Sequence, residues 1–352
     1  MRIVSLLPST TEILFAVGAG EDVVGVTFEC DHPPEARERR IVSLLPSTTE
    51  ILFAIGAGDR VVGVTFECDH PIEARARRIV STSALPEGLS LVEIDAAVSA
   101  RMAAGEDLYR LDEGALADLD ADLVVTQDLC AVCAVDAGDV EEALAHLGCE
   151  GRVLTVAPTD LEGVLASIVA LGDAVGAQER AEALVAGLRE RLAAVRARVA
   201  GARAPRTLVL EWTDPPFAPG HWVPEMIAAA GGRCALGRPG ERSERASWHD
   251  VAAAKPEVIV CAPCGLDLDA CVRVGREALE SGLMPDGVPV WAVDANASYA
   301  RPGPRLVDGI EALAGILHPH LAGPPPSGTA QILRSTPTTT PASVTSSGMI
   351  GS

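Results

Sequence analysis

Lysine is almost absent from this sequence, and aromatic residues are few. The chain has one lysine, Lys255, and aromatic residues make up 3% of its 352 residues. Phosphate-binding loops and Schiff-base catalysis both depend on lysine, so they have almost nothing to use here. The net charge is −21 and no basic cluster is visible. Because contact with phosphate needs clustered Lys and Arg, these features argue against nucleic acid and anionic membranes as partners.

Long apolar runs and a secretion signal are also missing. No run approaches the roughly 20 apolar residues of a membrane helix, and the first residues, Met-Arg-Ile-Val-Ser-Leu-Leu-Pro, lack the pattern of a signal peptide. We therefore expect a cytoplasmic protein with no membrane insertion. Nine cysteines in a reducing compartment stay free or bind metal more often than they pair, so we expect no structural disulfides.

The N-terminal part of the chain is duplicated. Residues 2–40 and 40–78 match at a period of 38 and differ only at the pairs 17/55, 21/59, 22/60, 34/72 and 38/76. Two copies followed by unrelated sequence do not make a solenoid. We expect residues 40–78 to occupy the sheet, with the copy at 1–39 appended or competing for the same place.

Each copy has the pattern of one strand, one short helix and a second strand. In the second copy, residues 40–45 and 61–66 are apolar and suit buried strands. Ser47 with Glu50 is typical of a capping box at the start of a helix, and Gly56 with Gly58 is typical of its end.

Further along, short β-rich runs alternate with helical patterns, which predicts an α/β fold with mainly parallel sheets covered by helices. The runs are residues 123–126, 153–156, 207–211, 258–260 and 288–293. Residues 159–201 interrupt this alternation. Apolar residues at helical spacing predict a helix of about 22 residues after Gly176, about 33 Å long at 1.5 Å per residue. Seven residues are expected on its apolar face: Ala181, Leu184, Val185, Leu188, Leu192, Val195 and Val199. We expect an N-terminal lobe at 40–158, hinge helices at 159–201 and a C-terminal lobe at 202–321. Residues 322–352 are rich in Pro, Ser, Thr and Gly and predict a disordered tail.

Three ordered motifs resemble a known family. They are Ile-Val-Ser-Leu-Leu-Pro-Ser-Thr-Thr-Glu with Val-Val-Gly-Val-Thr-Phe-Glu-Cys-Asp-His-Pro, then residues 210–217, then Arg301-Pro-Gly-Pro-Arg305. Together they resemble the helical-hinge solute-binding proteins of ABC importers, and the cobalamin-binding members most closely.

That resemblance implies two Rossmann-like lobes, joined by one long rigid helix, that hold a corrinoid or a metal chelate such as a ferric siderophore in the cleft between them. It also implies an ABC permease as partner and a periplasmic or cell-surface location, in contrast to the cytoplasmic expectation. No catalytic pattern is present, so we expect a binding protein rather than an enzyme. The ligand-binding residues that the resemblance and the strand-end positions predict are Pro46, Ser47, Glu67, Cys68, His70, Gln127, Asp128, Trp212, Phe217, Trp222, Tyr299 and Arg301.

Cysteines suggest an alternative function. Two Cys-x-x-Cys pairs follow expected strands, one in each lobe, and thiolates at this spacing suit zinc or an iron–sulfur cluster. A cytosolic metal-binding or redox protein on the same fold is therefore the second hypothesis. Cysteine is also among the residue types most often buried, so packing is the competing interpretation. The candidate metal ligands are Cys68, Cys130, Cys133, Cys261 and Cys264.

Overall fold

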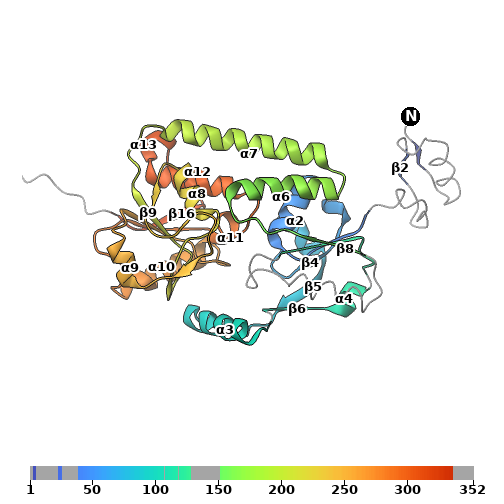
Figure 1. Ribbon diagram of the computed structural model, residues 1–352, viewed down its shortest axis with the longest axis horizontal. Coiled ribbons are helices and arrows are strands. Elements are labelled where there is room, and N and C mark those ends of the chain that lie inside the picture. Colours follow the sequence, from blue (N-terminus) through green and yellow to red (C-terminus); the bar gives the residue numbers. More distant parts are fainter. Residues whose placement is uncertain are drawn as a thin grey trace, which may run out of the picture. The chain divides into compact units, whose positions relative to one another are not determined.

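The computed structural model describes residues 3–4, 23–25, 39–106, 108–117, 119–127 and 151–335. The chain forms two compact units. The first contains residues up to Pro158 together with Glu162–Leu188, and the second contains Thr159–Leu161 and the chain from Arg189 onward. Each has its own sheet (Figure 1). Among the helices of the described part, none combines the length and hydrophobicity of a membrane span.

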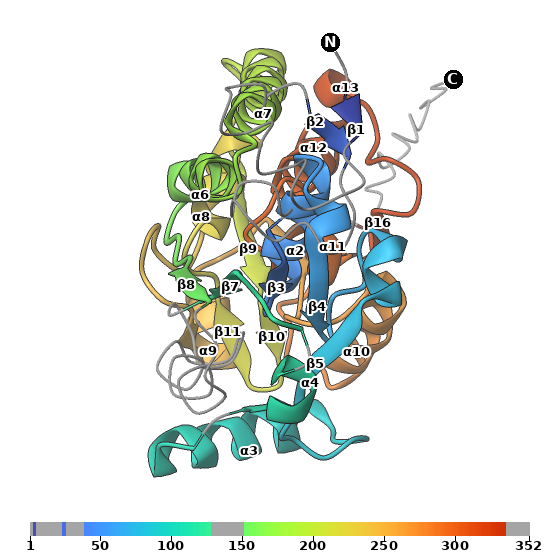
Figure 2. The ribbon, with the colours of Figure 1, turned by 90° about the vertical axis from the view of Figure 1, so that its right-hand side faces the viewer.

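The first unit is built on a six-stranded sheet in the order β6-β5-β4-β3-β7-β8, parallel except for the β5–β6 pair. Figure 2 shows β7, β3, β4 and β5 in this order across the sheet. The strands are β3 (Ile41–Ser43), β4 (Val61–Thr65), β5 (Arg78–Ser83), β6 (Tyr109–Leu111), β7 (Leu123–Thr126) and β8 (Arg152–Thr155). The helices are α2 (Pro46–Ala54), η3 (Gly58–Arg60), η4 (Ile72–Ala76), α3 (Leu91–Ala104), α4 (Glu113–Ala117) and α6 (Leu161–Ala174).

The second unit has a five-stranded sheet in the order β12-β9-β14-β15-β16, parallel except for the β15–β16 pair. The same part of the chain also forms a small antiparallel sheet with the strand order β10-β11-β13. The strands are β9 (Arg206–Leu210), β10 (Trp212–Thr213), β11 (Pro216–Ala218), β12 (Arg233–Cys234), β13 (Glu244–Arg245), β14 (Val258–Cys261), β15 (Val290–Val293) and β16 (Ala330–Arg334). The helices are α8 (Val223–Ala229), α9 (Trp248–Ala253), α10 (Leu268–Glu280), α11 (Ala295–Ser298), α12 (Leu306–Leu317) and α13 (Pro319–Ala322).

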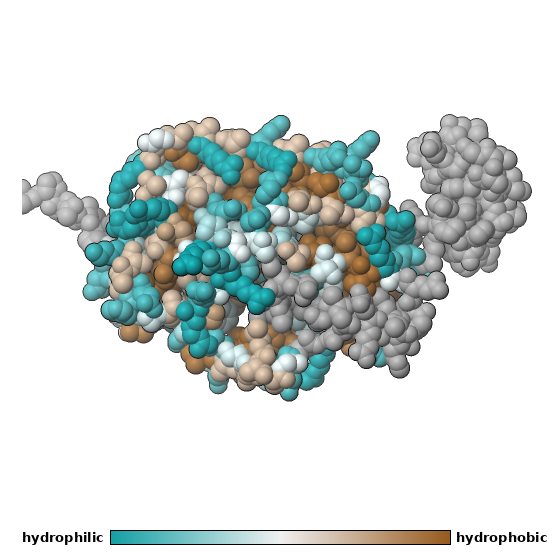
Figure 3. All heavy atoms as spheres, in the orientation of Figure 1, coloured by the Kyte–Doolittle hydropathy of each residue, from teal (hydrophilic) through white to brown (hydrophobic). Residues whose placement is uncertain are grey.

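Helix α7 (Gln178–Val199) has the length that the sequence predicts. The change from the first unit to the second falls inside this helix, at residue 189. Figure 3 shows hydrophilic side chains interspersed with more apolar ones along its outer surface. Its opposite face is apolar. Six of the seven residues expected on that face are buried, and Leu184 is half-buried. The buried six are Ala181, Val185, Leu188, Leu192, Val195 and Val199.

The first copy of the repeat forms strands β1 (Ile3–Val4) and β2 (Val23–Gly25), which pair in parallel. Ile3 pairs with Val23 and Val4 with Gly25, with a register shift between them. In the second copy Ile41 pairs with Val61 and Val42 with Gly63, again with a shift between them. Adding the period of 38 to the first register gives the second. The two copies therefore pair their strands identically.

The expected capping box at Ser47 and Glu50 is wrong. Helix α2 begins at Pro46, its N-cap is Leu45, and no side chain caps it. Proline suits the first helical position because its fixed φ is helical and it has no N–H to satisfy. Ser47 therefore lies one residue inside the helix. The expected helix end is confirmed, because Gly56 follows α2 with a left-handed φ of 72°.

The prediction of a disordered tail from residue 322 is wrong at residues 330–334. They form β16, which pairs antiparallel with β15 and covers its free edge. Leu333 packs against the apolar core of this sheet, and the Arg334 guanidinium donates to the carbonyl of Val288 at 2.8 Å. An unpaired edge strand is costly, so a short strand forms even in a segment rich in Pro, Ser and Thr.

Candidate functional site

A cluster of buried hydroxyl groups lies at the carboxyl end of β3. The Ser43 and Thr48 hydroxyls are 2.7 Å apart, and Thr49 donates to Ser43 Oγ at 2.9 Å. Thr49 Oγ1 also lies 3.0 Å from Cys68 Sγ, which joins the ends of β3 and β4. Each of these side chains is at most 3% exposed. The cluster therefore fixes the start of α2 beside the loop that follows β4, at the sheet edge where open α/β sheets bind ligands.

Next to this cluster, two aromatic rings come together at the surface. The centroids of Phe66 and Tyr109 are 6.2 Å apart, and Phe66 is 41% exposed. The Tyr109 hydroxyl donates to Glu67 Oε2 at 3.0 Å. Sequence reasoning selected Glu67 but missed the two rings. The position of Phe66 directly after β4 could have identified it, whereas Tyr109 belongs to β6, a strand that the sequence patterns did not predict.

The other candidates of the first unit differ in exposure. Pro46 and Ser47 are buried in the first turn of α2, and Gln127 is 4% exposed directly after β7. His70 is exposed. The structure therefore leaves His70 accessible to a ligand, while the buried residues shape the sheet edge. Three candidates, Asp128, Cys130 and Cys133, lie outside the described residues.

In the second unit, half-exposed aromatic rings follow the carboxyl end of β9. Trp212 and Phe217 face each other across the β10–β11 pair. Phe217 also pairs with Arg245, whose guanidinium carbon lies 5.8 Å from the ring centroid. This distance allows a cation–π interaction. The hairpin thus presents flat apolar area next to a positive charge.

Glu211 connects this hairpin to the following loop. Its carboxylate accepts hydrogen bonds from the Gly220 backbone N–H at 3.1 Å and from the Ser243 hydroxyl. Its backbone carbonyl accepts from Cys264 N at 3.0 Å. Glu211 therefore joins the segments that follow β9 and β14, and its geometry is that of a structural carboxylate.

Trp222 and Tyr299 lie in the core of the second unit, at 5% and 2% exposure. The Trp222 indole N–H donates to the Tyr299 carbonyl at 2.7 Å, and the Tyr299 hydroxyl donates to the Gly309 carbonyl at 3.2 Å. Burial raises the pKa of the Tyr299 hydroxyl. Both residues were expected as ligand contacts, but their described positions give them a packing role in this unit.

Replacing Trp222 with Phe is expected to lower the free energy of unfolding by about 2 kcal/mol, because the buried Tyr299 carbonyl loses its donor. Urea unfolding followed by circular dichroism measures the change. Trp248→Phe is the matched control, since Trp248 is half-buried on α9. Equal effects of the two substitutions would show that the hydrogen bond contributes nothing.

His221 lies between Gly220 and Trp222 with its ring stacked on Trp222, at a centroid distance of 5.6 Å. Its Nδ1 atom is buried and has no hydrogen-bond partner among the described residues. Burial and the nearby Arg242 lower the pKa of His221 below its usual value. The neutral imidazole is therefore the stable form in the folded unit.

This lowered pKa predicts a pH dependence of stability. Above the unfolded-state pKa of about 6.5, His221 is neutral in both states, and its contribution is complete. As the pH falls below that value, only the unfolded state takes up the proton, so stability decreases. His221→Asn removes the titration and tolerates the left-handed φ of 50°. Unfolding midpoints measured from pH 7.5 to 5.5 should fall less in the variant, and parallel curves would contradict the assignment.

Two of the four cysteines of the second unit are in the core. Cys261 and Cys271 are fully buried, and burial raises the pKa of each thiol to about 12. Cys264 is exposed. A high pKa favours the thiol over the thiolate that metals bind. Within the described residues, no three His, Cys, Asp or Glu side chains come together as a metal site. Arg301, the remaining candidate, is 7% exposed.

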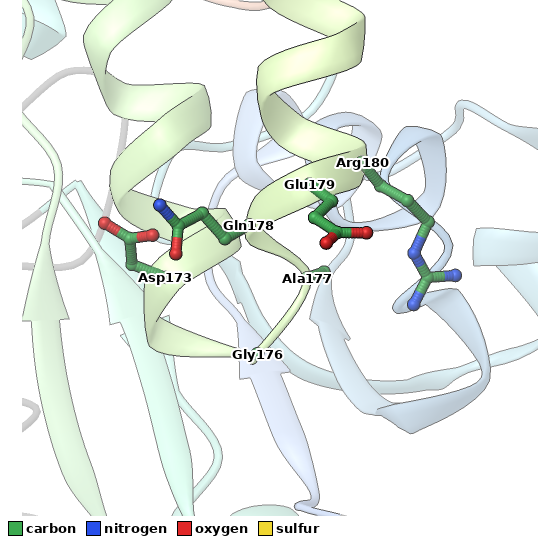
Figure 4. A pocket seen from close by; sticks show the side chains of 6 residues that line it. All are labelled: Asp173, Gly176, Ala177, Gln178, Glu179 and Arg180. Carbon is green, nitrogen blue, oxygen red and sulfur yellow. The ribbon is translucent and has the colours of Figure 1, made fainter.

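An open hollow of about 630 Å³ lies at the turn between α6 and α7. Figure 4 shows Gln178 extending toward Asp173, with Glu179 and Arg180 on the other side of the turn. Small-molecule sites are mostly apolar with a few polar groups. The lining here is charged and lacks aromatic rings, so we do not assign the ligand site to this hollow.

Comparison with known proteins agrees with this fold. The family model described as periplasmic binding protein matches residues 41–272. A search of curated protein sequences gave no match. Among solved structures, a periplasmic heme-binding protein from Pseudomonas aeruginosa aligns with a TM-score of 0.61 and 23% identity, over 80% of this chain and 94% of that one.

Two further structures align in the same way. The periplasmic vitamin B12-binding protein BtuF of Vibrio cholerae has a TM-score of 0.56 and 21% identity, over 79% of this chain and 96% of that chain. The periplasmic heme-binding protein RhuT from Roseiflexus sp. RS-1 has a TM-score of 0.59 and 23% identity, over 81% and 100%. These alignments show that the chain has the same two-lobed α/β fold.

Proposed function

Because the chain belongs to the periplasmic binding protein family, we propose that it binds a metal-centred macrocycle, either a corrinoid or heme, or a related iron chelate. The protein is a binding protein and not an enzyme. The carboxyl edges of the two sheets supply the ligand contacts in this proposal. The ligand is carried and released unchanged.

The observation that carries this proposal is the pairing of accessible aromatic rings with polar groups at each edge. Phe66 and Tyr109 lie beside Glu67 in the first unit. In the second, Trp212 faces Phe217, whose ring lies beside Arg245. Flat rings offer large contact area to a macrocycle at little cost in conformational entropy. The carboxylate and the guanidinium suit amide and carboxylate substituents, respectively.

The relatives narrow the ligand class. The similar structures include heme-binding and vitamin B12-binding proteins, and both of these ligands are metal complexes of a large ring. Few other ligands share that flat shape with a metal at the centre. The candidate contacts of the proposal are Pro46, Ser47, Glu67, Cys68, His70, Gln127, Asp128, Trp212, Phe217 and Arg301, to which the structure adds Phe66, Tyr109 and Arg245.

An ABC permease is the partner that this function requires, since a binding protein of an importer hands its ligand to one. The family description places its members in the periplasm, and the cytoplasm is the competing location. N-terminal sequencing and fractionation of the native protein separate the two. Recovery with the periplasmic or membrane-surface fraction would contradict the cytoplasmic prediction.

Titration of the full chain tests the ligand class. Hemin, cyanocobalamin and a ferric hydroxamate are added separately, and the fluorescence of the four tryptophans is followed. At least one ligand should quench it saturably, at one ligand per chain and micromolar or lower concentration. Metal-free protoporphyrin serves as the control for adsorption of an apolar ring. No saturable binding of any of the three metal complexes would contradict the proposal.

The metal or iron–sulfur alternative is a separate proposal on the cysteines. Cys261 is part of the apolar core, and Cys130 and Cys133 lie outside the described residues, so no contact within the described part of the chain favours this alternative. Elemental analysis of anaerobically purified protein tests it. Stoichiometric zinc or iron in protein free of macrocycle would support the alternative and count against a purely macrocyclic ligand.

A further inference from the structure

The chain contains two nearly identical segments, residues 2–40 and residues 40–78, but the first sheet has one β3-α2-β4 unit. Strands β3 and β4, joined by α2, are the central elements of the first sheet, where β3 pairs with β7 and β4 pairs with β5 (Figure 2). In the first copy, β1 and β2 pair with each other and with no other strand of the described part. An isolated two-stranded parallel sheet is a weak element that leaves both backbone edges unpaired. The first copy therefore gains two strand neighbours if it takes the central place.

The five sequence differences do little to prevent this replacement. Only one of them concerns a buried position, because Ile55 is 0% exposed and its counterpart is Val17. Asp59, Ile72 and Ala76 are exposed, and Arg60 is half-buried. Loss of one methylene in a core is among the mildest of core changes. The two copies should therefore fit the same place with similar stability.

The chain connectivity also permits the replacement. Residue 40 ends the first copy and begins the second. When residues 2–40 occupy the sheet, residues 41–77 become a loop that leads back into β5. Because the entropy cost of closing a loop grows only with the logarithm of its length, the longer connection disfavours this state only modestly.

We propose that residues 2–40 and residues 40–78 exchange within one chain for the β3-α2-β4 place in the first sheet. The exchange does not alter the candidate binding residues, because none of the five differences falls on them. When the first copy is in place, Phe28, Glu29, Cys30 and His32 stand where Phe66, Glu67, Cys68 and His70 stood. Each of these residues has a substitute in the same chain.

A larger side chain at Gly63 can exclude the second copy of the repeat from the first sheet. A Cβ at this position would lie 2.6 Å from Leu119 Cδ1 and 3.1 Å from Val80 Cγ1, which is too close in a packed core. Gly63→Ile therefore disfavours the second copy in the sheet. Gly25 is its counterpart in the first copy, and Gly25→Ile blocks that copy in the same way if it enters the sheet.

The test compares both single variants and the double variant in the full chain, without ligand. Exchange predicts that each single variant keeps a Tm close to that of the unchanged chain, whereas the double variant loses about 5 °C or more. Without exchange, Gly63→Ile alone gives the full loss and Gly25→Ile adds nothing. That second pattern would overturn the proposal, whatever the ligand titrations show.

Hydrogen exchange with mass analysis gives an independent reading on the unchanged chain. Peptides that contain Val17 or Ile55 differ in mass, so the two copies are followed separately. The backbone amides of both copies should be protected from hydrogen exchange to a similar, intermediate degree. In Gly63→Ile, the protection should move to the first copy. Protection confined to residues 40–78 would contradict the exchange of the two copies within one chain. So would stability of Gly63→Ile that depends on a dimer, as seen by size-exclusion chromatography.

Discussion

Replacing Gly309 with Ala should lower the free energy of unfolding of the second unit by about 2 kcal/mol or more. Gly309 lies in α12, where an added Cβ would be 2.4 Å from the Ser298 carbonyl oxygen and 3.0 Å from Met226 Cε. The Met226 side chain can move, but the Ser298 oxygen is backbone and belongs to α11. The substitution therefore forces α11 and α12 apart. The helix propensity gained by alanine, about 1 kcal/mol, does not offset this.

Gly187 provides the matched control for this prediction. It also lies inside a helix, α7, but an added Cβ there meets no described atom within 4 Å. Gly187→Ala should therefore raise stability by about 0.5–1 kcal/mol through helix propensity alone. Urea unfolding of both variants measures the contrast. If Gly309→Ala is as stable as the unchanged protein, the close packing of α11 on α12 is wrong.

Phe217→Ala should weaken ligand binding about tenfold or more, because buried aromatic contacts carry a large share of binding energy. The half-exposed ring of Phe217 faces Trp212 and stacks with Arg245, and its removal takes away both the flat surface and the support of the guanidinium. Phe217 occurs outside the repeat, so no second copy can substitute for it. Titration with whichever of the three metal complexes binds measures the loss.

Two further variants separate contact from stability. Phe217→Leu keeps an apolar side chain but loses the ring, so it should fall between Ala and Phe in affinity. Leu283→Ala removes an apolar side chain of the same unit that is 54% exposed and lies after α10. It should leave affinity unchanged. An unaltered Kd in Phe217→Ala would remove this residue from the site.

Sequence patterns predicted the helices and strands that have a clear apolar pattern in their own residues. Helix α7 follows from its apolar face, and β7, β9 and β14 follow from short apolar runs buried on both sides of a parallel sheet. Strands β5 and β16 were missed because most of their residues are polar or exposed. Ile79 in β5 is 50% exposed, and Ile332 in β16 is 44% exposed. Both strands exist because a neighbouring strand needs a partner, which is information from the tertiary structure.

The candidate site was predictable only in part, for a related reason. Glu67 and Cys68 lie in the loop just after β4, and their position at the sheet edge could be predicted from the strand alone. The burial of Trp222, Tyr299 and Cys261 could not, because it depends on α8, α12 and α10 packing around them. A single aromatic residue or cysteine near a strand end has the same local sequence whether it faces a ligand or a core.

Protein purified from its own cells without denaturation tests most directly whether the chain carries a metal-centred macrocycle. Its absorption spectrum and its native mass are measured together, followed by the mass of whatever unfolding releases. We expect one macrocycle per chain, with the absorption of a corrinoid or a heme. A colourless protein whose native mass equals that of the polypeptide alone, and which binds none of the three added metal complexes, would contradict the proposed function.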